Sequence, residues 1–238
     1  QLKNDATLIS MGSVYGNNNV FDLSANVTGW ANPYPSSIHD LHTLLHSDFI
    51  LSGTLNIHGN CSINGHWNSL ILSDDVNILI HPDSSLHLRN LEVDGISGSK
   101  IRCVNDSAQL LLDNVRWVQD DNFSFTRGSI LFNNEVNFVG PYLFNYASAL
   151  TSTISADSRW YLSDIIEVSL GRKNSYMDRN PIYFEDITSE WRMENCTVNI
   201  TGSGMDVTNG TITVDGEVKF DIDGTTSQCG LRFGDGVE

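Results

Sequence analysis

A short pattern recurs along the chain and limits what the chain can fold into. An apolar residue, any residue, a second apolar residue and a polar residue are followed by Asn, Asp or Gly, after which apolar alternation resumes with a shifted phase. Alternation with a period of two is typical of β-strands, and Asn, Asp and Gly tolerate the left-handed backbone of a sharp corner. Each copy therefore predicts two short strands that meet at a corner, with both apolar sets facing one core. The predicted corner residues are Gly59, Asp74, Asn90, Asn114, Asn134, Asp164, Asn195 and Gly216.

The distance between successive copies suits one coil of a parallel β-solenoid, with loops of varying size at the other corners. Such a coil cannot bury its apolar face alone, so neighbouring coils must stack on it. We predict an all-β parallel β-helix of about eight or nine coils over residues 49–238, open or truncated at its C-terminal end, where a partial copy begins at Leu231. Corner Asn side chains would stack as an amide ladder. An antiparallel β-sandwich is the alternative, because its strands also alternate and recur.

The N-terminal part lacks the repeat and predicts two other elements. Residues 1–35 are rich in Asn and Gly and indicate an extended arm. Over residues 36–48, Ser36 and Ser37 precede apolar residues at helical spacing, which predicts a short helix that caps the solenoid. The chain begins at Gln1 without an apolar leader segment, so we expect a processed mature chain or a piece of a longer one, which permits export.

Charge excludes one class of partner. The chain has 13 Lys plus Arg against 29 Asp plus Glu, a net charge of −16, and its bases are scattered. Binding to nucleic acid requires a basic surface, so we exclude it. The same negative charge disfavours acidic polysaccharides as substrates. The sequence also has no apolar run long enough to span a membrane.

The cysteines and the glycosylation motifs leave alternatives open. The four cysteines are far apart and lack metal-site spacing, so they suit either two disulfides, with Cys61–Cys103 and Cys196–Cys229 favoured, or buried free thiols. Asn-x-Ser/Thr motifs allow glycosylation without indicating it. They begin at Asn26, Asn60, Asn105, Asn122, Asn195, Asn199 and Asn209.

Residues able to carry out chemistry are few. Two pairs, Asp74–Asp75 and Asp120–Asp121, are candidate acid–base carboxylates on neighbouring coils, although Asp is also a common turn former. The segments 202–206 and 221–224 hint at calcium, but neither completes a known calcium loop. No other cofactor is indicated, and an enzyme is the less favoured interpretation.

Histidine and tryptophan positions point to structure. All seven histidines lie between His39 and His87, and His39, His42 and His46 would share one face of the predicted helix. No recognised metal-ligand motif is present, so we predict exposed surface histidines. Trp160 and Trp191 occupy the same position of the repeat, which predicts an aromatic stack inside the core.

With this repeat, residues 50–238 resemble the right-handed parallel β-helix group of pectin-lyase-like architecture. The segments 140–148 (GPYLFNYAS) and 181–186 (PIYFED) resemble parts of uncharacterised secreted repeat proteins from Dependentiae-type bacteria. The first resemblance implies a β-helix, a fold that often carries polysaccharide lyases and glycosidases. Neither resemblance supplies functional residues.

The open end favours a structural function. Unpaired backbone groups at the end of a solenoid invite docking, and repeated head-to-tail docking builds a filament. We therefore predict an extracellular or cell-surface subunit that self-assembles head to tail into a fibre. The alternatives are a carbohydrate-active or carbohydrate-binding β-helix that recognises surface glycans, and the passenger domain of an adhesin.

Overall fold

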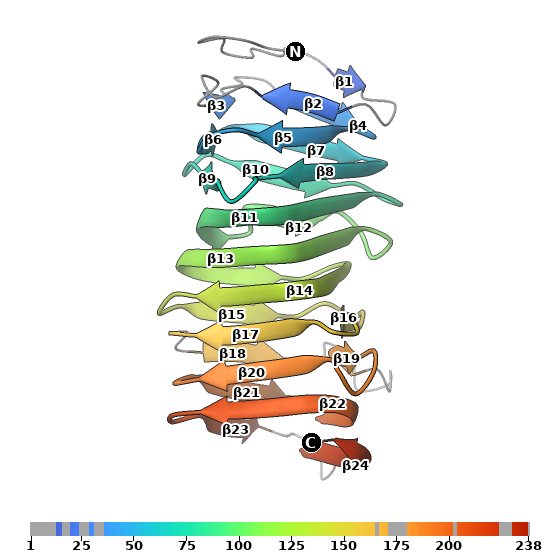
Figure 1. Ribbon diagram of the computed structural model, residues 1–238, viewed down its shortest axis with the longest axis vertical. Helices are drawn as coiled ribbons and strands as arrows, with labels where there is room; N and C mark the ends of the chain where they lie inside the picture. Colours follow the sequence, from blue (N-terminus) through green and yellow to red (C-terminus); the bar gives the residue numbers. More distant parts are fainter. Residues whose placement is uncertain are drawn as a thin grey trace.

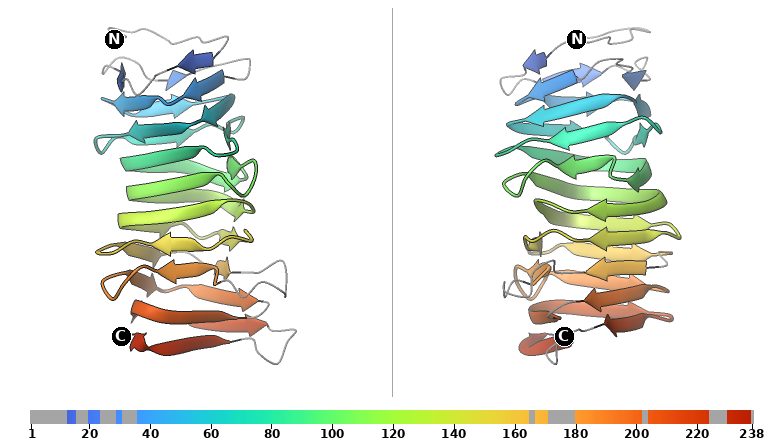
Figure 2. Two further views of the ribbon diagram at one scale, coloured as in Figure 1. Left: turned by 90° about the vertical axis from the view of Figure 1, so that its right-hand side faces the viewer. Right: turned by 180° about the vertical axis from the view of Figure 1, so that it is seen from behind.

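The computed structural model is a parallel β-solenoid of about eight turns (Figures 1 and 2). It describes residues 13–15, 20–23, 29–30, 36–164, 167–170, 180–201, 204–223 and 230–237. The pairings between the described strands are parallel, so the predicted solenoid is confirmed and the antiparallel sandwich is wrong. No helix occurs in these described ranges.

Each coil contributes strands to three faces. Face 1 contains β2 (Val20–Leu23), β5 (His42–Leu45), β8 (Asn60–Asn64), the first segments of β11 (Ser85–Gly98), β13 (Gln109–Phe125) and β14 (Ser129–Val139), then β16 (Ser152–Ile154), β19 (Ile182–Phe184) and the first segments of β22 (Met205–Asp215) and β24 (Leu231–Val237). Face 2 contains β3 (Gly29–Trp30), β6 (Phe49–Leu51), β9 (Ser69–Leu72), the second segments of β11, β13, β14, β22 and β24, and β17 (Arg159–Ser163) and β20 (Glu190–Glu194). Face 3 contains β1 (Ser13–Tyr15), β4 (Ser36–His39), β7 (Thr54–His58), β10 (Asn77–Ile80), β12 (Ile101–Cys103), the third segment of β13, β15 (Leu143–Tyr146), β18 (Glu167–Leu170), β21 (Thr197–Thr201) and β23 (Lys219–Asp223).

The predicted corner residues have the left-handed backbone that the repeat demands. Seven of the eight have positive φ, from 50° to 68°; the exception is Asp74, which lies in the turn between β9 and β10. They do not share one corner, however. Asn90, Asn114 and Asn134 join face 1 to face 2, whereas Asp164, Asn195 and Gly216 join face 2 to face 3, and Gly59 joins face 3 to face 1.

The predicted amide ladder is present at the corner between faces 1 and 2. Asn114 Nδ2 donates to Asn90 Oδ1 at 3.2 Å, and Asn90 Nδ2 donates to Asn64 Oδ1 at 3.5 Å. The next member, Asn134, turns its Nδ2 to Asp113 Oδ1 at 2.6 Å instead. Side-chain oxygens of one coil thus hold the corner of the next.

The core is filled along its length by aromatic and aliphatic side chains. Trp160 and Trp191 are fully buried and stack with ring centroids 5.4 Å apart and planes 6° from parallel. Phe132 extends this stack at 4.7 Å from Trp160. The predicted internal aromatic stack is therefore confirmed, and these rings cannot serve as an external platform.

The predicted capping helix over residues 36–48 is wrong. Ile38 lies in β4 and Leu45 in β5, whereas Leu41 lies in the corner between these strands, directly after Asp40 with φ 46°. Ile38, Leu41 and Leu45 all face the core because the left-handed corner shifts the phase of a period-two pattern. That shift produces a spacing of three and four residues, which imitates a helix.

The predicted N-terminal arm is also part of the solenoid where the structure describes it. Strands β1, β2 and β3 pair in parallel with β4, β5 and β6. These three strands therefore belong to a first coil. The rest of residues 1–35 lies outside the described residues.

The predicted disulfides are not found among the described cysteines. Cys61, Cys103 and Cys196 are free and buried, so the Cys61–Cys103 pairing is wrong, and Cys229 lies outside the described residues. Cys61 lies on face 1 and Cys103 on face 3. Burial raises the pKa of Cys103 to about 12 and that of Cys196 to about 11, so the thiols behave as small core residues.

Candidate functional site

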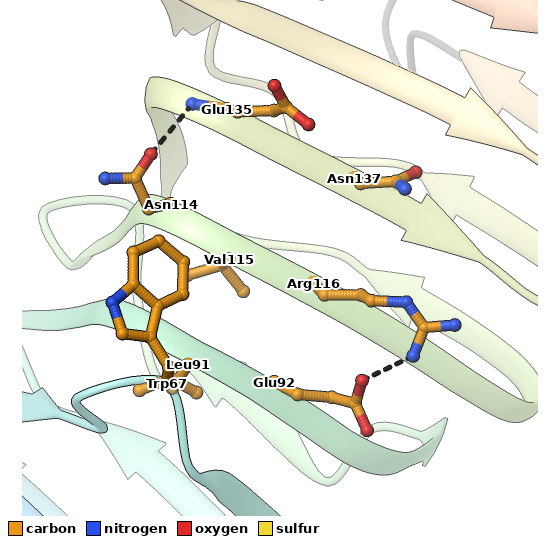
Figure 3. A pocket seen from close by; sticks show the side chains of 8 residues that line it. All are labelled: Trp67, Leu91, Glu92, Asn114, Val115, Arg116, Glu135 and Asn137. Atoms are coloured by element: carbon orange, nitrogen blue, oxygen red, sulfur yellow. Dashed lines mark hydrogen bonds and ion pairs between the residues drawn. The ribbon is translucent and has the colours of Figure 1, made fainter.

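A shallow groove of about 440 Å³ opens at the corner between faces 1 and 2 and extends over face 2 (Figure 3). Four successive coils contribute to it, so it lies across the strands. Its lining combines an aromatic ring, apolar side chains, amides and charged groups. The lining residues are Trp67, Leu91, Glu92, Asn114, Val115, Arg116, Glu135 and Asn137.

Trp67 is the most unusual residue of the groove. Its side chain is 77% exposed, and its φ of 71° lies in the left-handed region, which a bulky residue rarely adopts. The loop is fixed in this conformation, because Trp67 N donates to Asn90 O at 2.6 Å and Asn68 Nδ2 donates to Gly65 O at 2.7 Å. Backbone strain that the surrounding structure enforces concentrates at functional sites.

The apolar residues beside the indole belong to the buried core. Leu91 and Val115 are each 2% exposed, and Figure 3 shows the Trp67 ring beside them. Both side chains follow the left-handed corners Asn90 and Asn114 directly, so the corner geometry turns them toward the core. Their apolar surface is thus hidden in the core, and the indole itself is the exposed apolar surface of the groove.

Polar groups of the groove are already partly engaged with one another. Arg116 forms an ion pair with Glu92 of the preceding coil. Glu135 N donates to Asn114 Oδ1 at 3.4 Å, and Asn137 Oδ1 accepts a hydrogen bond from Ser163 Oγ at 3.0 Å. The groove therefore offers paired charges and amides, without a free cationic group in its lining.

The candidate catalytic carboxylates lie outside this groove. Both pairs are exposed at the corner between faces 2 and 3, two coils apart, or about 10 Å at the usual strand spacing. Asp74–Asp75 lie in the turn between β9 and β10, whereas Asp120–Asp121 lie within β13. Ser73 Oγ donates to Asp75 Oδ1 at 2.6 Å and lowers the pKa of that carboxyl. A general acid at neutral pH needs a raised pKa, so Asp75 is unsuited to that role.

One carboxylate of the second pair also makes a local hydrogen bond. Asp121 Oδ1 accepts a hydrogen bond from Asn122 N at 2.7 Å, as is usual for Asp in a turn. A catalytic use of either pair stays a prediction.

Three of the seven histidines form a stack that the sequence did not predict. His39, His58 and His81 occupy one position on successive coils of face 3, with ring centroids 4.5 Å and 4.1 Å apart. His42 lies on face 1, bonded to Ser62 at 2.8 Å, so the predicted shared helical face with His39 and His46 is wrong. Within the described ranges, no group of three or more His, Cys, Asp or Glu residues is arranged to hold a metal ion.

The hinted calcium segments are only partly described. Asp221 pairs with Lys219 at 3.1 Å, and Asp206 pairs with Arg232. Residues 202, 203 and 224 lie outside the described residues. Calcium binding stays a prediction.

The glycosylation motifs differ in exposure. Asn60, Asn122 and Asn195 are exposed, Asn105, Asn199 and Asn209 are half-buried, and Asn26 lies outside the described residues. Modification of any of them stays a prediction.

Comparison with known proteins adds no relative. No family model matches the chain, and neither does any curated protein or solved structure. Among the described residues, no helix has the length and apolar character needed to cross a bilayer. The structure thus supports a parallel β-solenoid, and the resemblances to pectin-lyase-like proteins and to Dependentiae-type repeat proteins stay predictions.

Proposed function

We propose that this protein is a carbohydrate-binding β-solenoid that binds neutral glycans in the Trp67 groove and does not cleave them. The observation that carries the proposal is the exposed indole of Trp67, which projects from a hydrogen-bonded turn beside the buried Leu91 and Val115. The C–H face of a sugar ring can pack on an indole, and the removal of this apolar surface from water favours binding.

The polar part of the groove suits hydroxyl groups. The amides of Asn114 and Asn137 and the carboxylate of Glu135 offer donors and acceptors around the indole. Arg116 is already neutralised by Glu92, and the chain carries a net charge of −16, so acidic glycans would be repelled. Neutral sugars suit this surface better.

The positions of the carboxylates in the groove favour binding without cleavage. Glu92 is in register with Arg116 and Arg116 with Asn137, so Glu92 and Glu135 lie two coils apart and are also offset along the strands. Two coils and a two-residue offset place their backbones about 12 Å apart at the usual spacings, beyond the carboxyl separations of about 5–9.5 Å that glycosidases use. A glycan ligand would be met at a cell surface or outside the cell, so we propose a secreted or surface-displayed protein.

The test is a printed array of neutral glycans probed with the wild-type chain and three variants. Trp67→Gly suits the left-handed backbone and removes the ring, so it should lower binding at least tenfold. Trp67→Phe restores a ring and should recover much of the signal. Tyr183→Ala removes an aromatic side chain that is 43% exposed on face 1, outside the groove, and should bind like the wild type.

Two results would contradict the proposal. One is the absence of binding to every neutral glycan on the array. The other is equal binding by the wild type and Trp67→Gly.

Head-to-tail self-assembly is a second proposed function. It is supported by the apolar side chains Val214, Ile222 and Phe233, which are 48%, 45% and 59% exposed. They lie in register with the buried residues Met193, Ile200 and Val207, so they occupy core-facing positions. Contact between copies would bury this surface. Sedimentation velocity at rising concentration should then show growing oligomers, and a constant monomer would contradict assembly.

A further inference from the structure

A second hollow of about 390 Å³ continues the Trp67 groove along the same corner. The two hollows share Asn114 and Glu135, so together they form one depression that crosses the strands. The lining of the second hollow is polar. It consists of Asn114, Asn134, Glu135, Asp157, Ser158, Arg159, Thr188 and Glu190.

The corner that carries this depression is compact over several coils. Five successive coils each place a residue with positive φ at this corner: Trp67, Asn90, Asn114, Asn134 and Asp157. Thr188 lies at the same corner of the following coil. From Asn90 to Asp157, strands meet at this corner with few residues between them, so no long loop blocks the way. Five steps of strand spacing separate the coils of Trp67 and Thr188, or about 24 Å.

Side chains of the second hollow are held in place. Arg159 Nε pairs with Glu190 at 2.6 Å, and Ser158 Oγ accepts a hydrogen bond from Asn134 N at 2.8 Å. Thr188 Oγ1 accepts one from Asp157 N at 2.6 Å. Groups fixed in this way lose little freedom when they meet a ligand, which favours binding.

We infer that the ligand is an extended, linear neutral glycan that lies parallel to the solenoid axis. One sugar ring packs on Trp67, and the following residues pass Asn114 and Glu135 to reach Asp157 and Thr188. This inference rests on the proposed carbohydrate-binding function. It adds the length and the direction of the ligand, which the Trp67 groove alone leaves open.

The experiment is isothermal titration with a disaccharide and a hexasaccharide from the linear β-1,4-glucan, β-1,3-glucan and mannan series. The hexasaccharide of the recognised series should bind the wild type at least tenfold more tightly than the disaccharide. Asp157→Gly preserves the left-handed corner and removes a side chain from the second hollow, so it should weaken hexasaccharide binding only. Asp83→Gly is the matched control, because Asp83 has φ 55° at a different corner.

The outcomes separate this inference from the proposed function. Equal affinity for the disaccharide and the hexasaccharide would overturn the inference and leave the Trp67 site standing. The inference would also be overturned if Asp157→Gly and Asp83→Gly bound the hexasaccharide with equal affinity. If the wild-type chain bound no neutral glycan, both the inference and the proposed function would be overturned.

Discussion

Replacement of Asn114 tests the physical basis of the corners. Asn114 has φ 52°, its Nδ2 donates to Asn90 Oδ1 at 3.2 Å, and its Oδ1 accepts from Glu135 N at 3.4 Å. Each hydrogen bond contributes about 0.5–1.5 kcal/mol net, and these two, being long and half-exposed, together contribute about 1 kcal/mol. A left-handed alanine costs a further 1–2 kcal/mol or so. Asn114→Ala should therefore lower the free energy of unfolding by about 2–3 kcal/mol, and Asn114→Gly by about 1 kcal/mol.

Urea unfolding followed by tryptophan fluorescence measures this difference, because Trp117, Trp160 and Trp191 are buried and report on the core. Equal slopes for the variants and the wild type are needed for the comparison. Asn145→Ala is the control, since Asn145 lies within β15 and its Nδ2 makes one bond, to Ser124 Oγ at 3.4 Å. The reasoning is refuted if the alanine and glycine variants of Asn114 are equally stable, or if Asn145→Ala costs as much as Asn114→Ala.

Three further predictions follow from the core, the thiols and the histidine stack. Trp160→Ala removes the middle of the aromatic stack and should cost about 3–5 kcal/mol in urea unfolding, whereas exposed Tyr183→Ala should cost under about 0.5 kcal/mol. Burial raises the pKa of three thiols, those of Cys61, Cys103 and Cys196. They should therefore resist a thiol reagent in the native protein and react once the protein is unfolded. Rapid labelling of these three thiols in the native protein would contradict their burial. Burial and the neighbouring imidazoles lower the pKa of His58, and burial and His39 lower the pKa of His81. Below about pH 6.5 the unfolded chain therefore takes up protons at these histidines more readily than the native protein does, so the native protein loses stability as the pH falls below that value. His58→Phe should weaken this pH dependence of the urea midpoint relative to the wild type, and an unchanged pH dependence in His58→Phe would contradict this account.

The corners were predictable because few residues satisfy their backbone. A left-handed φ favours Gly, Asn and Asp at the position, and the phase of the apolar alternation must change there. Asn90, Asn114 and Asn134 meet both conditions, and the structure places all three at one corner. The same change of phase misled the interpretation of residues 36–48, where the corner at Asp40 brings Ile38 and Leu41 to helical spacing.

The site was less predictable because outward side chains are free of packing constraints. Trp67 follows Gly65 and His66 in a four-residue turn between two strands, where an apolar residue has no core position to occupy. That was the signal for an exposed ring, and the repeat analysis missed it because Trp67 stands outside every copy of the pattern. The histidine stack was missed because the distances between His39, His58 and His81 along the chain vary with loop length.

Asn114 shows how one residue can couple stability and recognition in a solenoid. Its amide bonds the preceding coil, its oxygen accepts from the following coil, and its side chain lines both hollows. A loss of binding after its replacement would therefore not distinguish a damaged corner from a lost ligand contact. Trp67→Gly and Asp157→Gly avoid this ambiguity, because glycine suits both left-handed backbones and leaves their backbone hydrogen bonds possible. The ends of the depression, more than its middle, are where function can be tested without unfolding the coils that display it.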